Sequence, residues 1–498
     1  MHVVLLQCEL EHRHQAPHLA GALFASDLRG AGHRVRCALV HPSALDEAAA
    51  RYGDADLLLL DSIFPFAMVR RLMEATSARV VVGGHNALQH VLRGPATMAL
   101  VGAARRTLPP LVRGLEHGAP LNSLPGLWFR TPDGALDCGP APARTSPSAE
   151  VTPFTPHLDW DYLGPPRAPA SNLRVPSVVA ELGCVWNRTA LGPGGFYDGV
   201  LARAPQIEAT PAAQARLDRD FVAREGGCTF CTFRFQERRG HGSAASIDLV
   251  LAQARVLLAA GARGLSLQTE HPLPWLPELL DALAAHGLTD VIDELHVRTI
   301  PWLLLRHGAD LRRSIARARA HGVQLVLAQV GFEGFDTTTL AVYNKGLTAE
   351  DNRAAARLLG ALHAAETPTF LGTGGHGLVP LHPWSTPESV RDNVLACRAD
   401  APWLLPSLTP FARIELYNEW TPLFWKAADE GLVRPDPDAF GWTWDYADAR
   451  MGELCAASAS ILTRSGRPAD VLVAVANLIL DEPDPQARRA AYLALRGL

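Results

Sequence analysis

ADLLLLDSIFPFAMVRRLMEATSARVVVGGHNA, residues 55–87, contains two short apolar runs separated by a longer segment of mixed polarity. The runs at 57–60 and 80–82 hold no polar side chain, which is typical of strands that are buried on both faces. Between them, FAMVRRLMEAT (66–76) places its apolar residues at helical spacing. This order predicts two parallel strands joined by a crossover helix.

The same alternation continues toward the N terminus, in HVVLLQ (2–7), APHLAGALFASDLRGAGHRV (16–35) and CALVHP (37–42). We therefore expect residues 1–136 to form a parallel sheet with helices on both faces. Ligands of such sheets bind at the carboxyl ends of the strands. The candidate ligand-binding residues at those ends are Asp61, Ser62, Gly83, Gly84 and His85.

Composition limits the class of protein. A chain of 498 residues predicts about two or three domains, since a single core stops growing well below that length. The net charge of −5 gives no argument for binding nucleic acid or an anionic membrane. The start, MHVVLLQCEL, lacks the pattern of a signal peptide, and the eight cysteines are too dispersed for a disulfide framework. We expect a cytoplasmic protein.

Composition also divides the chain. Residues 137–172 are rich in proline and predict an extended linker. From 173 to 415, apolar strand patterns alternate with long helical patterns, and about six such units predict an open, partial (β/α) barrel with its chemistry at the carboxyl ends of the strands. Residues 416–498 predict a small helical cap.

One motif carries chemistry: EGGCTFCTFRFQ (225–236) places Cys228 and Cys231 in a C-x-x-C pattern. Three interpretations are open at this point: part of an iron–sulfur site, half of a zinc site, or two ordinary buried cysteines. Zinc needs two further ligands, and the chain has no second C-x-x-C.

Several segments in a fixed order resemble one enzyme family, the cobalamin-dependent radical S-adenosylmethionine enzymes, over roughly residues 1–415. This resemblance implies an α/β chain: an N-terminal Rossmann-like cobalamin-binding domain, a partial (β/α)6 radical S-adenosylmethionine barrel and a small helical C-terminal domain. The segments, besides the cysteine motif, are VVVGGHNA (80–87), RRTLPPLVRGLEHGAPLNSLPGLWFRTPDG (105–134), LDWDYL (158–163), VGFEGFDTTTLAVYNKGLTAEDN (330–352) and LHPWSTPESVRDN (381–393).

The resemblance also implies a [4Fe–4S] cluster held by three cysteines, usually spaced C-x-x-x-C-x-x-C. Here Arg224 stands where the first cysteine is expected. Cys184, in VVAELGCVWN, follows the first barrel strand, which is where that cysteine lies in the family. We therefore expect Cys184, Cys228 and Cys231 to hold the cluster, with residues 185–227 as an insertion that reaches the mouth of the barrel.

For S-adenosylmethionine, the resemblance points to polar residues that end successive barrel strands and to the aromatic residue before the second cysteine of the pair. The alternative is that these are rim residues with ordinary hydrogen bonds. The candidates are Phe230, Gln268, Glu270, Arg298 and Glu333, of which Glu333 occupies the place of a strand-four acid in the family.

For cobalamin, the sequence lacks the motif Asp-x-His-x-x-Gly, whose histidine binds cobalt in many cobalamin proteins. The resemblance implies that cobalamin binds without a protein histidine on cobalt. Two questions are open. His85 either approaches the corrin or is an ordinary surface histidine. The domain either binds cobalamin or keeps the fold without binding it.

The predicted activity is methylation of an unactivated carbon in a small metabolite. The alternatives are a rearrangement, cyclisation or oxidation without methyl transfer, and a sensor that binds cobalamin or a cluster without catalysis. The expected partners are the small-molecule substrate and a reducing protein such as flavodoxin or ferredoxin.

Overall fold

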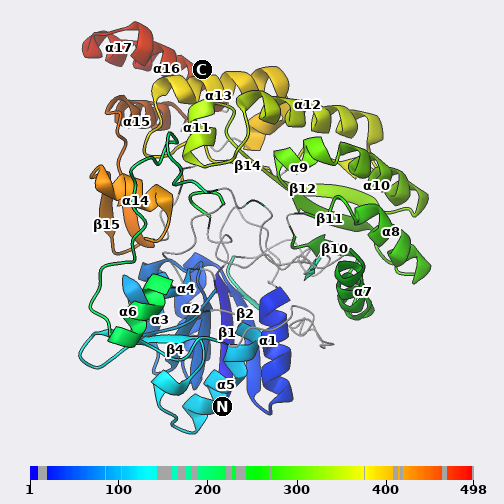
Figure 1. Ribbon diagram of the computed structural model, residues 1–498, viewed down its shortest axis with the longest axis vertical. Helices are drawn as coiled ribbons and strands as arrows, with labels where there is room; N and C mark the ends of the chain where they lie inside the picture. The colour runs from blue at the N-terminus through cyan, green and yellow to red at the C-terminus, as the bar shows by residue number, and fades with distance from the viewer. Residues whose placement is uncertain are drawn as a thin grey trace.

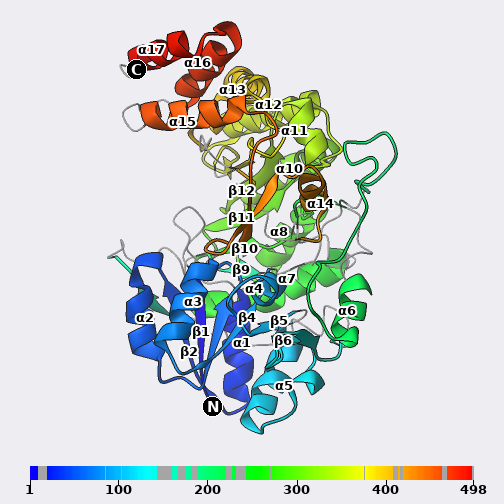
Figure 2. The same cartoon turned by 90° about the vertical axis from the view of Figure 1, so that its left-hand side faces the viewer.

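The computed structural model places two mixed α/β layers and a C-terminal group of helices along one axis (Figures 1 and 2). The sheet with the N terminus lies at one end and the last helices lie at the other. The structure describes residues 1–8, 19–84, 86–101, 104–142, 160–165, 175–178, 180, 186, 189–219, 227–231, 243–269, 271–374, 376–407, 413–414, 419–462 and 468–495.

The first sheet has eight strands in the order β7-β6-β5-β4-β3-β1-β2-β8. Strands β1 to β5 and β8 pair in parallel, while β6 and β7 add an antiparallel edge. The strands are β1 (His2–Cys8), β2 (Arg34–Val40), β3 (Leu57–Asp61), β4 (Arg79–Gly83), β5 (Met98–Leu100), β6 (Leu127–Arg130), β7 (Leu136–Cys138) and β8 (Asp161–Leu163).

Helices cover both faces of this sheet, which explains why its central strands are apolar throughout. Val3 and Leu5 face the core under α1 and α5, whereas Val4 and Leu6 face the core under α2, α3 and α4. The predicted parallel sheet with helices on both faces is confirmed. The helices are α1 (Leu19–Gly30), α2 (Leu45–Tyr52), α3 (Phe66–Ala75), α4 (Ala87–Leu92) and α5 (Ala104–Glu116), with short 3-10 turns at Pro42–Ala44 and Leu121–Ser123.

The second sheet has six strands, five of them in the order β13-β12-β11-β10-β9, with β14 paired to the far end of β12. All of these pairs are parallel, as in an open barrel. The strands are β9 (Ser177–Val178), β10 (Gly264–Leu267), β11 (Glu294–Thr299), β12 (Gln324–Glu333), β13 (Phe370–Leu371) and β14 (Gly377–Leu378).

Helices from the same part of the chain pack on the outer side of these strands, in one large apolar core. In β11, Leu295, Val297 and Thr299 are buried, and the residues between them are half-buried, so its two faces differ in polarity. The helices are α7 (Ser243–Ala259), α8 (Leu276–Ala285), α9 (Pro301–Arg306), α10 (Gly308–Ala320), α11 (Thr337–Val342), α12 (Ala349–Glu366) and α13 (Pro387–Asp400), with a 3-10 turn at Pro402–Ser407.

The C-terminal part contains a β-hairpin in addition to the predicted helices. The hairpin packs against the first sheet's helices, since Ala439 and Asp438 accept backbone hydrogen bonds from Phe66 and Ala67. The elements are α14 (Pro422–Asp429), β15 (Val433–Asp436), β16 (Gly441–Trp444), α15 (Arg450–Leu462), α16 (Pro468–Asp481) and α17 (Pro485–Leu495).

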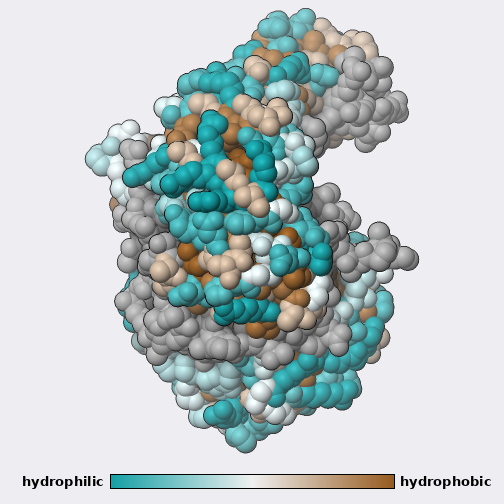
Figure 3. Space-filling view, turned by 90° about the vertical axis from the view of Figure 1, so that its right-hand side faces the viewer, coloured by the Kyte–Doolittle hydropathy of each residue, from teal (hydrophilic) through white to brown (hydrophobic). Residues whose placement is uncertain are grey.

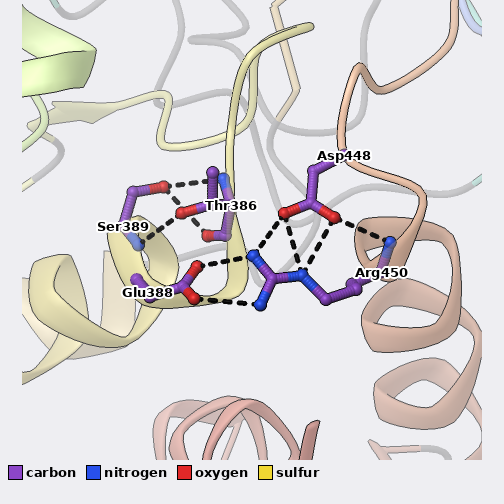
Figure 4. A network of polar contacts seen from close by, with 5 residues as sticks. All are labelled: Thr386, Glu388, Ser389, Asp448 and Arg450. Atoms are coloured by element: carbon purple, nitrogen blue, oxygen red, sulfur yellow. Dashed lines mark hydrogen bonds and ion pairs between the residues drawn. The ribbon is translucent and has the colours of Figure 1, made fainter. Parts of the chain in front are cut away.

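A charged network joins the helices of this part to the barrel (Figure 4). Arg450, at the start of α15, donates to both carboxylate oxygens of Glu388 at 3.0 and 3.1 Å and to Asp448 at 2.6 Å. Glu388 lies in the first turn of α13, where Thr386 and Ser389 form a reciprocal capping box. The network therefore fixes the start of one helix against the start of another.

Two stretches differ from the sequence-based expectation. Within the predicted linker, residues 161–163 form β8, because Asp161 accepts from Arg36 and Tyr52 and so holds this strand against β2. Within the predicted insertion, Ala209 bridges to Leu136 at the edge of the first sheet, and α6 (Pro211–Leu217) packs on the core beside it. The described part of the insertion thus covers a sheet edge, and it also contacts the barrel, where the Tyr197 hydroxyl donates to the Val342 carbonyl at 2.5 Å.

Hydrophilic residues cover much of the coloured surface in Figure 3. Across the described ranges, no helix combines the length and the apolar character that crossing a membrane requires.

Candidate functional site

The predicted cysteine motif forms a tight turn against the segment that follows α11. The amide of Cys231 donates to the carbonyl of Cys228 at 3.1 Å, and both cysteines are half-buried. Between them, Thr229 is fully buried: its hydroxyl donates to the Val342 carbonyl at 2.7 Å and its amide to the Tyr343 carbonyl at 3.3 Å. A buried threonine thus anchors the turn and leaves the two sulfur atoms on either side of it.

Asn344 connects this turn to Trp186, which follows β9 in sequence. Its side-chain amide donates to the carbonyl of Gly227 at 2.9 Å, and its own carbonyl accepts from the indole of Trp186 at 2.7 Å. Trp186 lies two residues after Cys184. One asparagine therefore brings the two parts of the predicted split loop to the same place, although many residues separate them in sequence.

The backbone around Asn344 is shaped for this contact. Asn344 has a φ of 50°, a left-handed conformation that asparagine tolerates better than most residues. At Gly346, with a φ of 62°, an added Cβ would lie 2.0 Å from the Trp186 ring. Glycine is required there both by the backbone and by the indole that packs on it.

Phe230, predicted near the cofactors, packs edge-on against Tyr343, with ring centroids 4.9 Å apart. The Tyr343 hydroxyl donates to the carbonyl of Val379 at 2.8 Å. Burial raises the pKa of Tyr343 well above its usual value, and the Glu333 carboxylate adds to that rise. The tyrosine therefore stays neutral and serves as a rigid support for the cysteine turn.

Glu333 ends β12 and forms a buried ion pair with Lys345. The distance from Lys345 Nζ to Glu333 Oε1 is 3.2 Å, and the side chains are 6% and 12% exposed. Glu333 has a φ of 61°, which is unusual for a residue other than glycine, asparagine or aspartate. At Gly331 a Cβ would lie 2.8 Å from the Glu333 carboxylate, so glycine leaves room for the pair.

Two further candidates lie on the neighbouring strands. Gln268, just after β10, donates to the hydroxyls of Ser177 at 3.0 Å and Ser266 at 3.2 Å. Arg298 lies on the half-buried face of β11, in register with Gln329 of β12. Arg298 therefore lies on a strand of the predicted barrel and Gln268 directly after one, and their role toward S-adenosylmethionine remains a prediction.

Three predicted site residues lie outside the described residues: Cys184, Glu270 and His85. Among the residues that are described, no group of three or more histidine, cysteine, aspartate or glutamate side chains is arranged to hold a metal ion. The pair formed by Cys228 and Cys231 thus needs at least one ligand from elsewhere, and the structure does not test Cys184 in that role.

At the carboxyl end of the first sheet, Asp61, Ser62, Gly83 and Gly84 lie together as expected for neighbouring parallel strands. The amide of Ser62 donates to the Gly83 carbonyl at 2.8 Å, and the Ser62 hydroxyl accepts from the amide of Asn86 at 3.2 Å. Both hydrogen bonds of Ser62 therefore stabilise the turn after β4.

The two glycines of this turn are not equivalent. Gly84 has a φ of 118°, and a Cβ there would lie 2.5 Å from the Ser62 hydroxyl. The fold alone thus explains that glycine. At Gly83 an added Cβ would meet nothing within 4 Å, so the space above it is open.

His90, on α4, lies beneath this turn and was not singled out from the sequence. Its Nε2 donates to the Ser62 carbonyl at 3.0 Å, and the side chain is fully buried. Burial lowers the pKa of His90 to about 4, although the bond to Ser62 opposes that shift. A neutral histidine therefore supports the strand ends from within.

Sequence reasoning also missed the roles of Trp186, Asn344 and Lys345. The available signal was the Asn-Lys-Gly turn after a strand-ending acid, because asparagine followed closely by glycine favours a left-handed backbone. The contacts of that turn join segments far apart in the chain, and periodicity carries no information on such contacts.

Comparison with known proteins used both sequence and structure. No family model matches the sequence, and no curated protein matches it. The cobalamin-dependent S-adenosylmethionine radical enzyme OxsB, solved with aqua-cobalamin and S-adenosylmethionine bound, aligns with a TM-score of 0.57 and 13% identity, over 100% of this chain and 75% of that one. The radical S-adenosylmethionine methyltransferase TsrM from Kitasatospora setae, solved with cobalamin and a [4Fe-4S] cluster, aligns with a TM-score of 0.53 and 16% identity, over 99% and 88%.

The chain has the fold of the cobalamin-dependent radical S-adenosylmethionine enzymes. This confirms the predicted α/β architecture, with a parallel N-terminal sheet, a partial barrel and C-terminal helices. The identities are low, so the likeness concerns the fold alone.

Proposed function

We propose that this chain is a cobalamin-dependent radical S-adenosylmethionine enzyme that methylates an unactivated carbon of a small metabolite. The observation that carries the proposal is the pair of hydrogen bonds made by Asn344, one to Gly227 and one from Trp186. Through these bonds Asn344 holds both Gly227, which precedes Cys228, and Trp186, which lies two residues after Cys184 in sequence.

The donor set fits a cluster with one open iron. Cys228 and Cys231 are half-buried on one turn and form no disulfide, and the buried ammonium of Lys345 offsets negative charge beside them. Burial lowers the pKa of Lys345, but the charges of Cys228, Glu333 and Cys231 outweigh it, so the net pKa is raised. We assign the third thiolate to Cys184, which leaves one iron for S-adenosylmethionine.

The first sheet suits cobalamin at its carboxyl edge. The open space above Gly83 allows close approach of a ligand to the backbone, and Ser62 and Asp61 flank it. Because the chain lacks Asp-x-His-x-x-Gly, we propose that cobalamin binds there without a protein histidine on cobalt.

When bound, the cluster, S-adenosylmethionine and cobalamin would supply an electron, a hydrogen-abstracting radical and a transferable methyl group. The chain's own residues hold and orient these groups. Thr229 and Asn344 fix the cysteine turn, and Glu333, Gln268 and Arg298 are our candidates for holding the amino, ribose and carboxylate parts of S-adenosylmethionine.

The proposal includes two partners and a compartment: a small-molecule substrate, an electron donor of the flavodoxin or ferredoxin class, and the cytoplasm. The alternatives to methyl transfer are a rearrangement, cyclisation or oxidation, and non-catalytic sensing.

Turnover with S-adenosylmethionine labelled in its methyl group separates these possibilities. A methyltransferase yields both 5′-deoxyadenosine and S-adenosylhomocysteine and transfers the label to a product. Deoxyadenosine without S-adenosylhomocysteine or labelled product indicates a rearrangement or oxidation. Absence of both nucleoside products, in protein shown to hold a cluster, contradicts an enzymatic function of this type.

A further inference from the structure

Lys345 is a buried cation beside the candidate site. Its side chain is 6% exposed, and its Nζ lies 3.2 Å from the Glu333 carboxylate. Removing a charged pair of this kind from water costs free energy that the attraction between the partners only partly returns. Net stability is therefore a weak explanation for this buried pair.

The backbone places this lysine beside the cysteine turn. The three preceding residues, Val342, Tyr343 and Asn344, all hydrogen bond to residues 227–229. The amide of Lys345 then donates to the Leu340 carbonyl at 3.0 Å, which closes the turn after α11. The ammonium is thus held by the same short segment that anchors the motif.

The charges around Lys345 are mostly negative. Cys228, Glu333 and Cys231 all favour its charged form, and they outweigh the opposing effect of burial, which is the largest single contribution. Gly331 contributes by its small size, since a Cβ there would lie 3.4 Å from the Lys345 Nζ and 2.8 Å from the Glu333 carboxylate. The site therefore has one carboxylate 3.2 Å from the ammonium, and two cysteines whose charge acts on it.

We propose that Lys345 is a positioning residue that sets the reduction potential of the cluster held at Cys228 and Cys231, and that Glu333 partly offsets its charge. This inference rests on the proposed function. Reduction by one electron, from a donor of the flavodoxin or ferredoxin class, adds one negative charge to the site and requires no proton. A fixed buried ammonium stabilises that added charge, and a buried carboxylate opposes it.

Lys345 and Glu333 should therefore shift the reduction potential of the cluster in opposite directions. Loss of the ammonium moves the potential to more negative values and makes reduction harder. Loss of the carboxylate charge moves it to more positive values. A lysine that merely packs the fold predicts no such ordered pair of shifts, since loss of either partner would only lower stability.

The test is a redox titration of the anaerobically reconstituted full-length protein, followed by visible absorbance and by electron paramagnetic resonance. The variants are Lys345→Met, Lys345→Arg, Glu333→Gln and the double variant Lys345→Met with Glu333→Gln. We expect a negative shift for Lys345→Met, a positive shift for Glu333→Gln, and potentials close to wild type for Lys345→Arg and for the double variant.

An unchanged potential in Lys345→Met, or shifts of the same sign in Lys345→Met and Glu333→Gln, overturns the inference while leaving the proposed function intact. If Lys345→Met does not assemble a cluster, the sign of the Glu333→Gln shift decides: a shift to more positive values supports the inference, and any other result overturns it. If the wild-type protein assembles no cluster, the proposed function fails and the inference fails with it.

Discussion

The indole nitrogen of Trp186 donates a hydrogen bond of 2.7 Å to the carbonyl of Asn344, the residue whose side chain holds Gly227. This contact holds Trp186, which follows β9 in sequence, beside the cysteine turn. Under the proposed function it would bring the two parts of the cluster loop together across the insertion, because closing a loop costs free energy that grows only slowly with its length.

Asn344→Asp tests this link with almost no change of shape. Aspartate keeps the tolerance for a left-handed backbone, but its carboxylate only accepts and cannot donate to the Gly227 carbonyl. We expect a loss of about 1–3 kcal/mol in unfolding free energy and a lower iron content after reconstitution. Asn477→Asp, on the distant α16, is the matched control. Equal iron content in the two variants contradicts the link.

Gly83→Val tests the cobalamin position. The added side chain enters open space in the protein, so we expect normal folding, and it would occupy the room proposed for the corrin. A clash costing about 1.4 kcal/mol or more weakens binding about tenfold or more, which equilibrium titration with cobalamin measures.

Cobalamin binding as tight as in the wild type would place the cofactor elsewhere. Gly84 is a poor choice for this test, because its φ of 118° and its nearness to Ser62 disfavour a side chain even without ligand.

His376 predicts a pH dependence of stability. Its Nδ1 accepts from the Val330 amide at 3.0 Å and its Nε2 donates to the Gly372 carbonyl at 2.7 Å, so the folded state holds the neutral ring. Burial lowers the pKa of His376 to about 4, with the bond to Gly372 opposing that shift. Because the unfolded chain, with a pKa of about 6.5, binds the proton first, stability falls as the pH drops from about 6.5 toward about 4.

We expect His376→Gln to be less stable than the wild type near neutral pH. The wild type should lose about 2 kcal/mol more than the variant between about pH 7.5 and about pH 5. Urea unfolding at the two pH values measures this difference. A stability gap that stays constant with pH contradicts the assignment of a neutral buried histidine.

Glu419 hydrogen bonds to residues of the first sheet's domain and of the C-terminal hairpin, and we expect these contacts to contribute strongly to stability. It is 5% exposed and accepts from Arg93 at 2.5 and 2.9 Å and from the Trp442 indole at 2.9 Å. Glu419→Gln turns one acceptor into a donor and leaves Arg93 without its counter-charge, so we expect a loss of about 3 kcal/mol or more in unfolding free energy.

The more exposed ion pairs of Arg450 in Figure 4 should contribute less to stability than the buried contacts of Glu419. Arg450 is 45% exposed, and Arg450→Met should cost less than about 1 kcal/mol, because water already screens that pair. Thermal or urea unfolding of both variants measures the order. An Arg450→Met protein that is less stable than Glu419→Gln contradicts this account.

Sequence reasoning predicted the regular parts of the fold because each has a local cause. The apolar runs that became β3 and β4 must be buried on both faces, and Asp61 and Gly83 follow from where those runs end. It did not predict β8, since Asp161 is held by Arg36 and Tyr52 from distant parts of the chain.

In the candidate site, too, local sequence patterns pointed to some residues, while contacts between distant segments could not be predicted. Cys228 and Cys231 were selected from their C-x-x-C spacing and Glu333 from the family resemblance, and their roles stay predictions. The contacts of Lys345 and Asn344 were not predicted, because they join segments that only the folded chain brings together.

Iron content after anaerobic reconstitution of three single variants, Cys184→Ala, Cys228→Ala and Cys231→Ala, tests the central claim most directly. Cys455→Ala, at a partly exposed cysteine on α15, is the matched control. We predict that each of the three variants loses the [4Fe–4S] cluster and the cleavage of S-adenosylmethionine, while the control keeps both. A Cys184→Ala protein that retains the full cluster and full cleavage contradicts the divided cluster loop.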